Sequence, residues 1–403
     1  MTYWNKMKTF LEAQKISQYT REMRQHLHRN PELAFQEYET ATFIISQLKE
    51  MGYEVKEGVG GTGIVAIFNS GRPGKTILLR FDMDGLPIHE DTGHAFASQC
   101  GGRMHACGHD GHMAVGLSIA KLLHEKTDEI KGKIVFVFQP AEEIGQGAKA
   151  MIADGILDGE PVDYALAVHL WADKPYGWIG IPDGPVMGGS SDLMIDVIGK
   201  GGHAARPDLT IDPLYIASQI VVALQSVIAR SLSPNQAAVV SITQIEASDR
   251  RNIIANKVSM AGTIRWFDNQ TRDLLKERIE SISKGIAVSF DAETEVQIKE
   301  STIPVVNDPL VSSVCRQIIQ DMRVDVKELF VDSNYRTNIS EDFAYITNHV
   351  PGAMLLVGAA QALDGAIYPH HHPKFDIDER SMTLAVAVLL EATKALTETK
   401  SGY

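Results

Sequence analysis

The sequence predicts an α/β protein in which a small ferredoxin-like domain is inserted into a larger domain. Apolar runs of strand length alternate with helical patterns in the first and last thirds of the chain. Between them, residues 193–299 carry strand and helix patterns in the order β-α-β-β-α-β. In the larger domain, polar residues of chemical interest follow the ends of predicted strands, where open α/β sheets bind their ligands. We therefore expect one site along a sheet edge.

Composition and charge exclude several classes of partner. The chain has 403 residues, 44% of them hydrophobic and 22% charged, which suits a globular protein of two domains. A formal net charge of −13 argues against nucleic acid or an anionic membrane as the main partner. Three cysteines are too few for a disulfide framework, residues 1–15 lack the apolar core of a signal peptide, and no stretch approaches the ~20 apolar residues of a membrane span. We expect a cytoplasmic protein.

The first elements are two helices within residues 16–51 and two strands. Apolar and aromatic residues at helical spacing from Phe35 to Leu48 predict the second helix, which ends at Gly52. Strands are expected at residues 63–68 and 76–82. The stretch 58–63 matches the dinucleotide pattern G-x-G-x-x-G, but it runs into a strand and not into a helix, so we reject that function.

Two carboxylates follow the second strand. Asp82 and Asp84 stand two residues apart at its carboxyl end, so their side chains are expected on one face. A role in a turn or a helix cap is the alternative for either one.

The next motif, H-A-C-G-H-D-G-H at residues 105–112, has the character of a metal site. Cys107 and His109 lie in a glycine-containing loop just before a predicted helix, so their side chains can converge on one point. Thiolate and imidazole suit zinc-like ions. A histidine-rich surface loop is the alternative for this stretch taken alone.

Two further strands end in residues of the same kind. The buried run 133–138 leads to the adjacent pair Glu142 and Glu143, of which one can bind a metal while its neighbour takes a proton from water. Acidic residues at a helix start would look similar. The strand 164–168 leads to His169.

The predicted inserted domain covers residues 188–302, and the larger domain covers residues 1–187 and 303–403. Within the insert we expect strands at 193–198, 237–244, 257–265 and 295–299, and helices at 212–230 and 270–289. The larger domain then resumes with a helix at 308–322, a helix capped by Ser340, a strand at 353–358, a histidine triple at 370–372 and a closing helix at 379–395.

The ligand-type residues at element ends number five. They are Cys107, His109, Glu143, His169 and one of the histidines His370, His371 and His372. Five protein ligands are too many for one catalytic zinc, which usually keeps three, but they fit two ions that share a water.

Seven motifs in this order resemble the dinuclear metallopeptidase family of aminoacylase, carboxypeptidase G, hippurate hydrolase and the auxin-conjugate hydrolases. The chain is most similar to its N-acyl-amino-acid amidohydrolase branch. The motifs are H-L-H-R-N-P-E-L (26–33), R-F-D-M-D-G-L-P (80–87), H-A-C-G-H-D-G-H (105–112), Q-P-A-E-E (139–143), A-V-H (167–169), G-K-G-G-H-A-A-R-P (199–207) and H-H-P-K-F-D (371–376). The resemblance covers nearly the whole chain and implies a zinc-peptidase-like catalytic domain with an inserted lid.

The resemblance also implies a role for each site residue. Cys107, His109, Glu143, His169 and His371 would bind two divalent ions of zinc, manganese, cobalt or nickel. Glu142 would be the general acid and base, Asp84 an orienting carboxylate, and His203 a lid histidine that reaches the substrate carbonyl across a homodimer. Asn252 and Arg265 would lie near the substrate carboxylate. The branch usually has leucine where His370 stands, which leaves the register of the last ligand open by one residue.

The implied function is hydrolysis of N-acyl amino acids, and several alternatives stay open. A dipeptidase or carboxypeptidase of the same family would use the same groups. Cys107 beside imidazoles could instead be the nucleophile of an amidase. A non-catalytic metal store is the third class, although a store has no need for Glu142 beside a ligand. For Arg265, a salt bridge within the lid is the alternative to substrate binding.

Overall fold

The computed structural model describes residues 3–125, 130–158, 161–248, 250–323 and 326–399. These residues form two compact units. Unit 1 comprises Met1–Val186, Val305–Tyr335 and Asp342–Tyr403, and unit 2 comprises Met187–Pro304 and Arg336–Glu341. The short segment Arg336–Glu341 belongs to unit 2, whereas the predicted boundaries place it in the larger domain.

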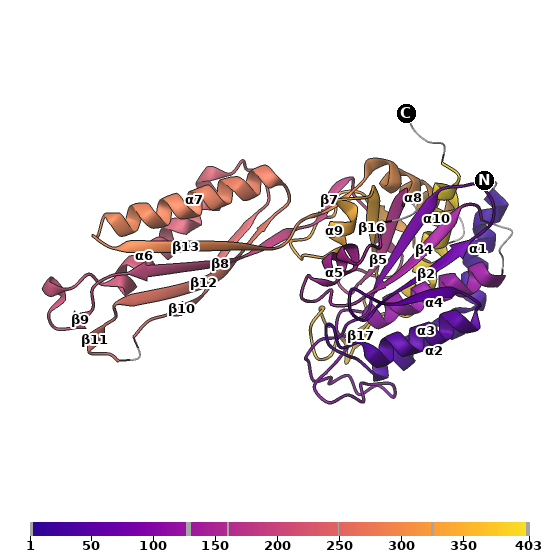
Figure 1. The fold of residues 1–403 in the computed structure, drawn as a ribbon, viewed down its shortest axis with the longest axis horizontal. Coiled ribbons are helices and arrows are strands. Elements are labelled where there is room, and N and C mark those ends of the chain that lie inside the picture. The colour runs from indigo at the N-terminus through magenta and orange to yellow at the C-terminus, as the bar shows by residue number, and fades with distance from the viewer. Residues whose placement is uncertain (1–2, 126–129, 159–160, 249, 324–325, 400–403) are drawn as a thin grey trace. The chain divides into compact units, whose positions relative to one another are not determined.

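Unit 1 contains an eight-stranded mixed sheet (Figure 1). In sheet order its strands are β1 (Glu54–Val59), β2 (Gly63–Asn69), β4 (Lys133–Gln139), β3 (Thr76–Asp82), β5 (Tyr164–Trp171), β16 (Gly352–Gly358), β6 (Trp178–Gly180) and β15 (Phe330–Asp332). The central strands β3, β5 and β16 are buried at every residue, which explains their nearly continuous apolar sequences.

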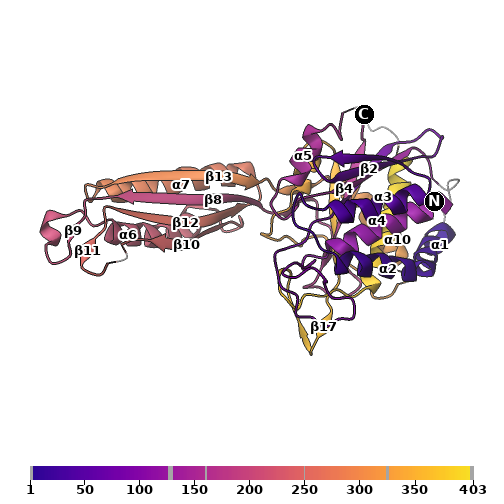
Figure 2. The same ribbon diagram turned by 60° about the horizontal axis from the view of Figure 1, so that its bottom comes forward.

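Helices of unit 1 pack on this sheet and on one another. They are α1 (Tyr3–Lys15), α2 (Ser17–Arg29), α3 (Tyr38–Glu50), α4 (His109–Glu125), α5 (Gly147–Ala153), α8 (Pro309–Met322), α9 (Phe343–Thr347) and α10 (Arg380–Thr397). Helix α4 contacts β3 and β5, and α2 lies outside α4, away from the strands (Figures 1 and 2). Because α4 is covered from both sides, all but three of its residues are buried.

Short strands complete unit 1 and flank the insertion. They are β7 (Gly184–Met187), β14 (Val305–Asn307), β17 (Ala362–Leu363) and β18 (Ala366–Ile367).

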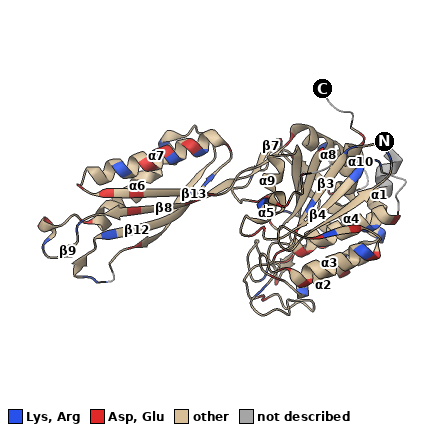
Figure 3. Cartoon of the chain, in the orientation of Figure 1, with Lys and Arg blue, Asp and Glu red and all other residues tan. Residues whose placement is uncertain are grey.

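Unit 2 has the predicted ferredoxin-like order. Its elements are β8 (Gly189–Ile198), β9 (Gly202–His203), η2 (Pro207–Leu209), α6 (Pro213–Ser226), η3 (Val227–Ser231), β10 (Val239–Glu246), β11 (Ile253–Ile254), β12 (Lys257–Trp266), α7 (Asn269–Val288) and β13 (Glu293–Thr302). The antiparallel sheet runs β10-β12-β8-β13, and α6 and α7 pack against it around one apolar core. Acidic and basic residues are mixed along α7 (Figure 3), so this helix presents no surface of a single charge.

One segment of unit 2 bears on the expectation that no stretch is apolar enough to span a membrane. Judged by length and composition alone, Pro213–Ser231 is long and apolar enough to cross a membrane, so the expectation does not hold for this segment. Ile216, Ile220 and Leu224 of this segment lie in the core of unit 2. A core helix of a globular domain passes the same test, so the segment carries no further argument.

Three details differ from the sequence analysis. Phe35 does not begin a helix: it has φ +59 in a turn, and α3 begins at Tyr38. Strand β1 was not expected. It pairs with β2, and the glycine-rich stretch 58–63 forms the turn of this β1–β2 hairpin. As expected, the stretch leads into a strand and not into a helix. Ser340 caps no helix, because α9 begins at Phe343 after Asp342.

Candidate metal centre

The register of the central strands brings the polar strand ends together. In the parallel pair of β3 and β4, Asp82 lies opposite Gln139, so the segments that carry Asp84 and Glu142 leave the sheet side by side. Strand β5 pairs in parallel on the other side of β3 and carries His169 toward the same edge. The predicted convergence at one sheet edge is confirmed.

Cys107 and His169 approach each other at the start of α4. The Cys107 sulfur lies 3.5 Å from His169 Nε2, and both side chains are buried. The intervening Gly108 has φ +89, a conformation that favours glycine, and it allows the loop to turn directly into the helix at His109. The donor atoms of Cys107, His109 and His169 all lie within 4.8 Å of one another.

The ring of His109 is oriented to offer a lone pair to a cation. Its Nδ1 lies 2.8 Å from the backbone carbonyl oxygen of Asp84, which can only accept, so Nδ1 carries the proton and donates. Its buried Nε2 has no hydrogen-bond partner among the described residues. The same atom lies 3.7 Å from Asp82, 3.8 Å from Glu143 and 3.9 Å from Glu142.

The electrostatic surroundings of His109 are acidic. Burial alone would lower the pKa of its imidazole, but the nearby carboxylate of Asp82 and the hydrogen bond to Asp84 outweigh burial and raise that pKa to about 10. A cation that binds Nε2 would therefore displace a proton from it. Several carboxylates around a fully buried imidazole create a site that a cation neutralises.

Glu143 and His371 form a second donor group with Cys107. Glu143 Oε2 lies 3.3 Å from His371 Nε2, and the donor atoms of the three residues lie within 4.8 Å of one another. The buried Oε1 of Glu143 has no hydrogen-bond partner in the described part of the chain. Burial raises the pKa of Glu143, but the hydrogen bond from His371 and the charge of His109 lower it overall. The two donor groups share Cys107.

The structure separates the three consecutive histidines. His371 has φ +65, and its amide donates to the carbonyl of Ala106 at 2.8 Å, which holds its ring near Cys107. His370 Nε2 instead donates to the carbonyl of Leu170 at 3.0 Å, and its ring packs on Trp171. Within the described residues, neither His370 nor His372 belongs to a group of donors close enough to hold a metal.

The chemistry of these donors fits two divalent ions. Five groups of three donors occur among the described residues, and the two that share Cys107 contain the soft and borderline ligands that zinc-like ions prefer. The other three groups are Asp82, His109 and His112; His109, Glu142 and Glu143; and Glu142, Glu341 and Asp342. The two orphaned buried atoms, His109 Nε2 and Glu143 Oε1, would each lose hydration without compensation unless a ligand takes them up.

Asp84 holds the turn that carries both glutamates. Its Oδ1 accepts from the amide of Glu142 at 3.0 Å and its Oδ2 from the amide of Glu143 at 3.1 Å. Together with the carbonyl contact to His109, Asp84 therefore orients three residues of the site without being one of the grouped donors.

Two supporting networks were not predicted from sequence. His112 donates from Nδ1 to Asp82 at 2.6 Å and accepts at Nε2 from the amide of Leu170, beside His169. Arg80 also donates to Asp82, at 2.6 Å. The i, i+3 spacing of His109 and His112 at the start of α4 was the available signal.

The second network joins distant segments around Arg24. This buried arginine of α2 donates to Asp110 at 3.1 Å and to Asp376 at 2.8 Å. His28, one turn further along α2, donates to the same Asp110 at 2.8 Å. Because Asp110 follows His109 and Asp376 lies on the loop after His371, the network links two ligand-bearing segments, and only the tertiary structure reveals it.

The remaining predicted residues lie in unit 2, His203 and Asn252 at its two-stranded sheet and Arg265 in its four-stranded sheet. His203 is exposed in β9, whose partner β11 follows Asn252 directly, and the Asn252 carbonyl accepts from Ala204 at 3.1 Å. Arg265 lies near the other end of β12, opposite Ser190. Eight residues of strand separate Lys257 from Arg265, which is roughly 27 Å. Burial lowers the pKa of the Arg265 guanidinium, and the nearby charge of Asp192 only partly opposes this.

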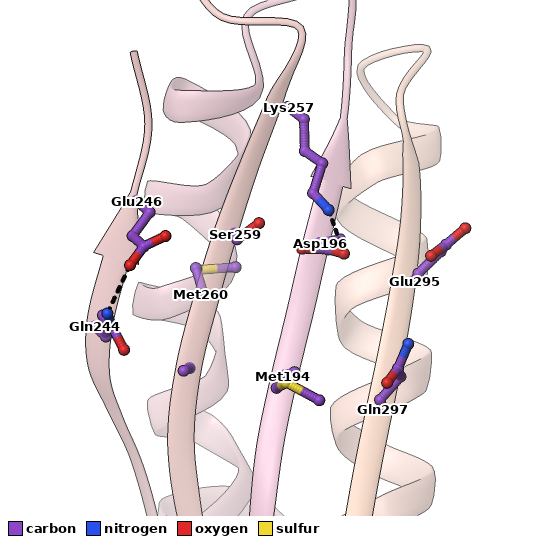
Figure 4. A pocket seen from close by; sticks show the side chains of 10 residues that line it. Met194, Asp196, Gln244, Glu246, Lys257, Ser259, Met260, Glu295 and Gln297 are labelled. Carbon is purple, nitrogen blue, oxygen red and sulfur yellow. Dashed lines mark hydrogen bonds and ion pairs between the residues drawn. The ribbon is translucent and has the colours of Figure 1, made fainter. Parts of the chain in front are cut away.

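A hollow of about 300 Å³ also lies in unit 2. Figure 4 shows its side chains on the face of the sheet that is turned away from the helices. It is lined by Met194, Asp196, Gln244, Glu246, Lys257, Ser259, Met260, Ala261, Glu295 and Gln297. None of these residues belongs to the donor groups, so the hollow has no part in the metal centre.

Comparisons with known proteins identify the family. The model of peptidase family M20/M25/M40 matches residues 78–395. N-acetyl-L-cysteine deacetylase of Bacillus subtilis is 38% identical over 374 residues, which cover 93% of this chain and 87% of that protein. Thermostable carboxypeptidase 2 of Saccharolobus solfataricus is 38% identical over 388 residues, 95% and 97% of the two chains. The crystal structure of a dinuclear metal-binding peptidase of the M20 family from Bacillus subtilis is 32% identical, with a TM-score of 0.83, and covers 96% of this chain and 100% of that one.

Proposed function

The chain belongs to peptidase family M20/M25/M40, and from this premise we propose that it hydrolyses the amide bond of N-acyl amino acids to a carboxylic acid and a free amino acid. It is a metal-dependent amidohydrolase with a site for two divalent ions. The observation that carries the proposal is the pair of donor groups around Cys107, with the carboxylate of Glu142 3.9 Å from His109. Glu142 belongs to neither of these two groups, but its donor atoms lie close to those of His109 and Glu143.

The proposed mechanism divides the work between the two adjacent glutamates. When bound, the ions lower the pKa of the attacking water and polarise the scissile carbonyl. Glu142 takes the proton of that water and later gives it to the leaving nitrogen. Glu143, with Cys107, His109, His169 and His371, would hold the ions. The hydrogen bonds from the backbone amides of Glu142 and Glu143 to Asp84 fix the turn from which the two side chains extend.

Recognition of the substrate carboxylate is proposed for Arg265 with Asn252. A guanidinium makes paired hydrogen bonds to a carboxylate. Within unit 2 the carboxylate of Asp192 attracts the Arg265 guanidinium, but the described contacts include no ion pair between them. Arg265 lies on β12 of the four-stranded sheet, opposite Ser190, whereas Asn252 lies beside the separate two-stranded sheet of β9 and β11, so we propose that a single copy of unit 2 does not bring both to one carboxylate. This separation supports a homodimer in which one subunit supplies Arg265 and its partner supplies Asn252 and His203.

The alternative with direct support is a carboxypeptidase or dipeptidase. Thermostable carboxypeptidase 2, which is similar over nearly the whole chain, favours it by name. A peptide and an N-acyl amino acid present the same amide and the same terminal carboxylate to this machinery. The difference lies in the group on the acyl side.

A hydrolysis screen tests the proposal directly. The metal-free protein is incubated with zinc, manganese, cobalt or nickel and assayed on N-acetyl, N-benzoyl and long-chain N-acyl amino acids beside dipeptides. We expect cleavage of the acyl amino acids that a chelator abolishes and added metal restores. Activity that survives the chelator and shows an acyl-enzyme burst would instead identify Cys107 as a nucleophile.

The native metal and the compartment are further proposals. Thiolate and imidazole donors favour zinc, and the carboxylates of the site also suit manganese. All three cysteines are free thiols in the structure, which supports a reducing, cytoplasmic setting.

A further inference from the structure

A fully buried carboxylate outside the metal centre holds the turn before the catalytic glutamates. Glu37 lies between α2 and α3, and its side chain has no exposed surface. Its Oε1 accepts from the amide of Ala141 at 2.9 Å and from the amide of Phe35 at 3.0 Å. Its Oε2 accepts from the hydroxyl of Thr62 at 2.5 Å. Glu37 therefore joins its own segment to two distant ones, at Thr62 and at Ala141, the residue that precedes Glu142.

Glu37 and Asp84 share the turn between them. The amides of Ala141, Glu142 and Glu143 are consecutive, and the first donates to Glu37 while the other two donate to Asp84. Two carboxylates thus hold three successive amides. Such oriented amides form a concave group that favours negative charge.

The turn also has a backbone conformation that needs support. Ala141 has φ +54, in the left-handed region that residues with a side chain rarely adopt. Such a conformation persists when surrounding contacts determine it. Glu37 accepts the hydrogen bond from the backbone amide of Ala141. Loss of this hydrogen bond would let the backbone at Ala141 relax, and the carboxylate of Glu142 would move with it.

We infer that Glu37 is a positioning residue that sets the place of the general base Glu142 by accepting the amide hydrogen of Ala141. This inference rests on the proposed amide hydrolysis with Glu142 as base. Glu37 touches neither the donor groups nor the reacting atoms, so its effect passes through the backbone.

Two substitutions distinguish the effect of the side-chain length of Glu37 from the effect of its charge. Glu37→Gln loses the charge but keeps an oxygen that can accept from Ala141, and its amide group can donate to Thr62. Glu37→Asp keeps the charge but is one methylene too short. We expect E37D to lose roughly 10- to 100-fold in kcat with little change in KM, because a small misplacement of a catalytic group is costly. E37Q should stay within a few-fold of wild type.

A control and a second readout exclude a purely structural effect. Thr62→Val removes the bond to the other oxygen of Glu37 and should lower Tm while leaving kcat near wild type. Hydrogen exchange of the metal-free protein should show faster exchange at residues 141–143 in E37D, but not in T62V. This measurement depends on neither metal nor turnover.

Three outcomes would overturn the inference. They are an E37D variant with wild-type kcat, an E37Q variant as impaired as E37D, and a T62V variant as impaired as E37D. A wild-type protein that cleaves no acyl amino acid or peptide would instead refute the proposed function. In that case unchanged exchange at residues 141–143 in E37D would still refute the positioning role by itself.

Discussion

At the scale of single residues, the site depends on neighbours that carry different chemistry. Glu142 and Glu143 are adjacent, yet only Glu143 has an orphaned buried oxygen and a contact with His371. His370 and His371 are also adjacent, and they turn toward different partners. Substitution of one member of each pair therefore tests one function at a time.

Glu142→Gln is expected to keep bound metal and substrate affinity while losing most turnover, because the amide keeps the shape of the side chain but cannot transfer the proton. A loss of roughly 10²–10⁴-fold in kcat is typical of a general base. Glu143→Gln should lower the metal content itself, measured by elemental analysis. Near-normal turnover of E142Q would move the role of base to another carboxylate.

His371→Ala is expected to cost about one metal equivalent per chain, because its ring shares a donor group with Cys107 and Glu143. His370→Leu should keep both metals, since the His370 ring donates only to a backbone carbonyl and packs on aromatic rings. Metal analysis of the two purified variants decides between them. Loss of metal from H370L alone would shift the last ligand by one residue.

His28 gives stability a pH dependence. Burial would lower the pKa of His28, but Asp110 and Glu90 outweigh it and raise that pKa to about 9, above the ordinary 6.5. A raised pKa stabilises the folded state fully below pH 6.5, and this stability is lost as the pH rises through 9. We expect the metal-free protein to lose roughly 3 kcal/mol of unfolding free energy across that window.

The control for this prediction is His28→Gln. Urea titrations at several pH values should show a flatter profile for H28Q than for the wild type between pH 6.5 and 9. Parallel profiles would mean that His28 is neutral in the folded state.

At the scale of elements, α4 must lie close to β3 because each carries part of the site. A Cβ atom on Gly116 of α4 would lie 2.7–2.9 Å from the buried ring of Phe81 in β3. Only glycine allows this approach, so the distance between His109 and the carboxylates that follow β3 depends on Gly116.

Gly116→Val should therefore separate the helix from the strand. We expect a loss of about 1–3 kcal/mol in unfolding free energy from overpacking, and weaker metal binding. The matched control is Gly285→Ala in α7, where an added Cβ has no atom within 4 Å. G285A should stabilise by up to about 1 kcal/mol through helix propensity. Urea denaturation of both variants measures the two effects, and equal stability of G116V and wild type would contradict the packing argument.

At the scale of the whole molecule, the proposed substrate residues of unit 2 do not converge. His203 and Asn252 lie at the two-stranded sheet of β9 and β11, which follows the Ile198 end of β8, and Arg265 lies opposite Ser190 at the other end of β8. Strand β12 is hydrogen-bonded to β10 and β8 on its two sides, which opposes a local movement of Arg265 toward them. In the proposed homodimer, each chain would supply His203 and Asn252 to the site of the other chain, which supplies Arg265.

Mixing of inactive variants tests this arrangement. Homodimers of His203→Ala and of Glu142→Ala should each be nearly inactive, because one lacks a donor to the developing oxyanion and the other lacks the base. After subunit exchange, each mixed dimer contains one site with Glu142 and His203 both intact. Activity should approach half that of wild type per mixed dimer. If mass measurement confirms exchange and no activity returns, His203 does not act across subunits.

Three features could be predicted from sequence patterns: the fold class, the ferredoxin-like insert, and the sheet edge where the polar residues converge. These follow from local causes: apolar period fixes helix or strand, and parallel strands place their carboxyl ends together. Phe35 and Ser340 were assigned wrongly because a left-handed turn and a late helix start leave no such local pattern.

The contacts that give neighbouring residues different roles are visible only in the folded protein. The separation of His370 from His371, the lone pair that His109 offers, and the hold of Glu37 on Ala141 all depend on contacts between segments tens to hundreds of residues apart. A buried carboxylate selects its partners by packing and by the need to satisfy every donor and acceptor, and that need is defined only once the chain has folded.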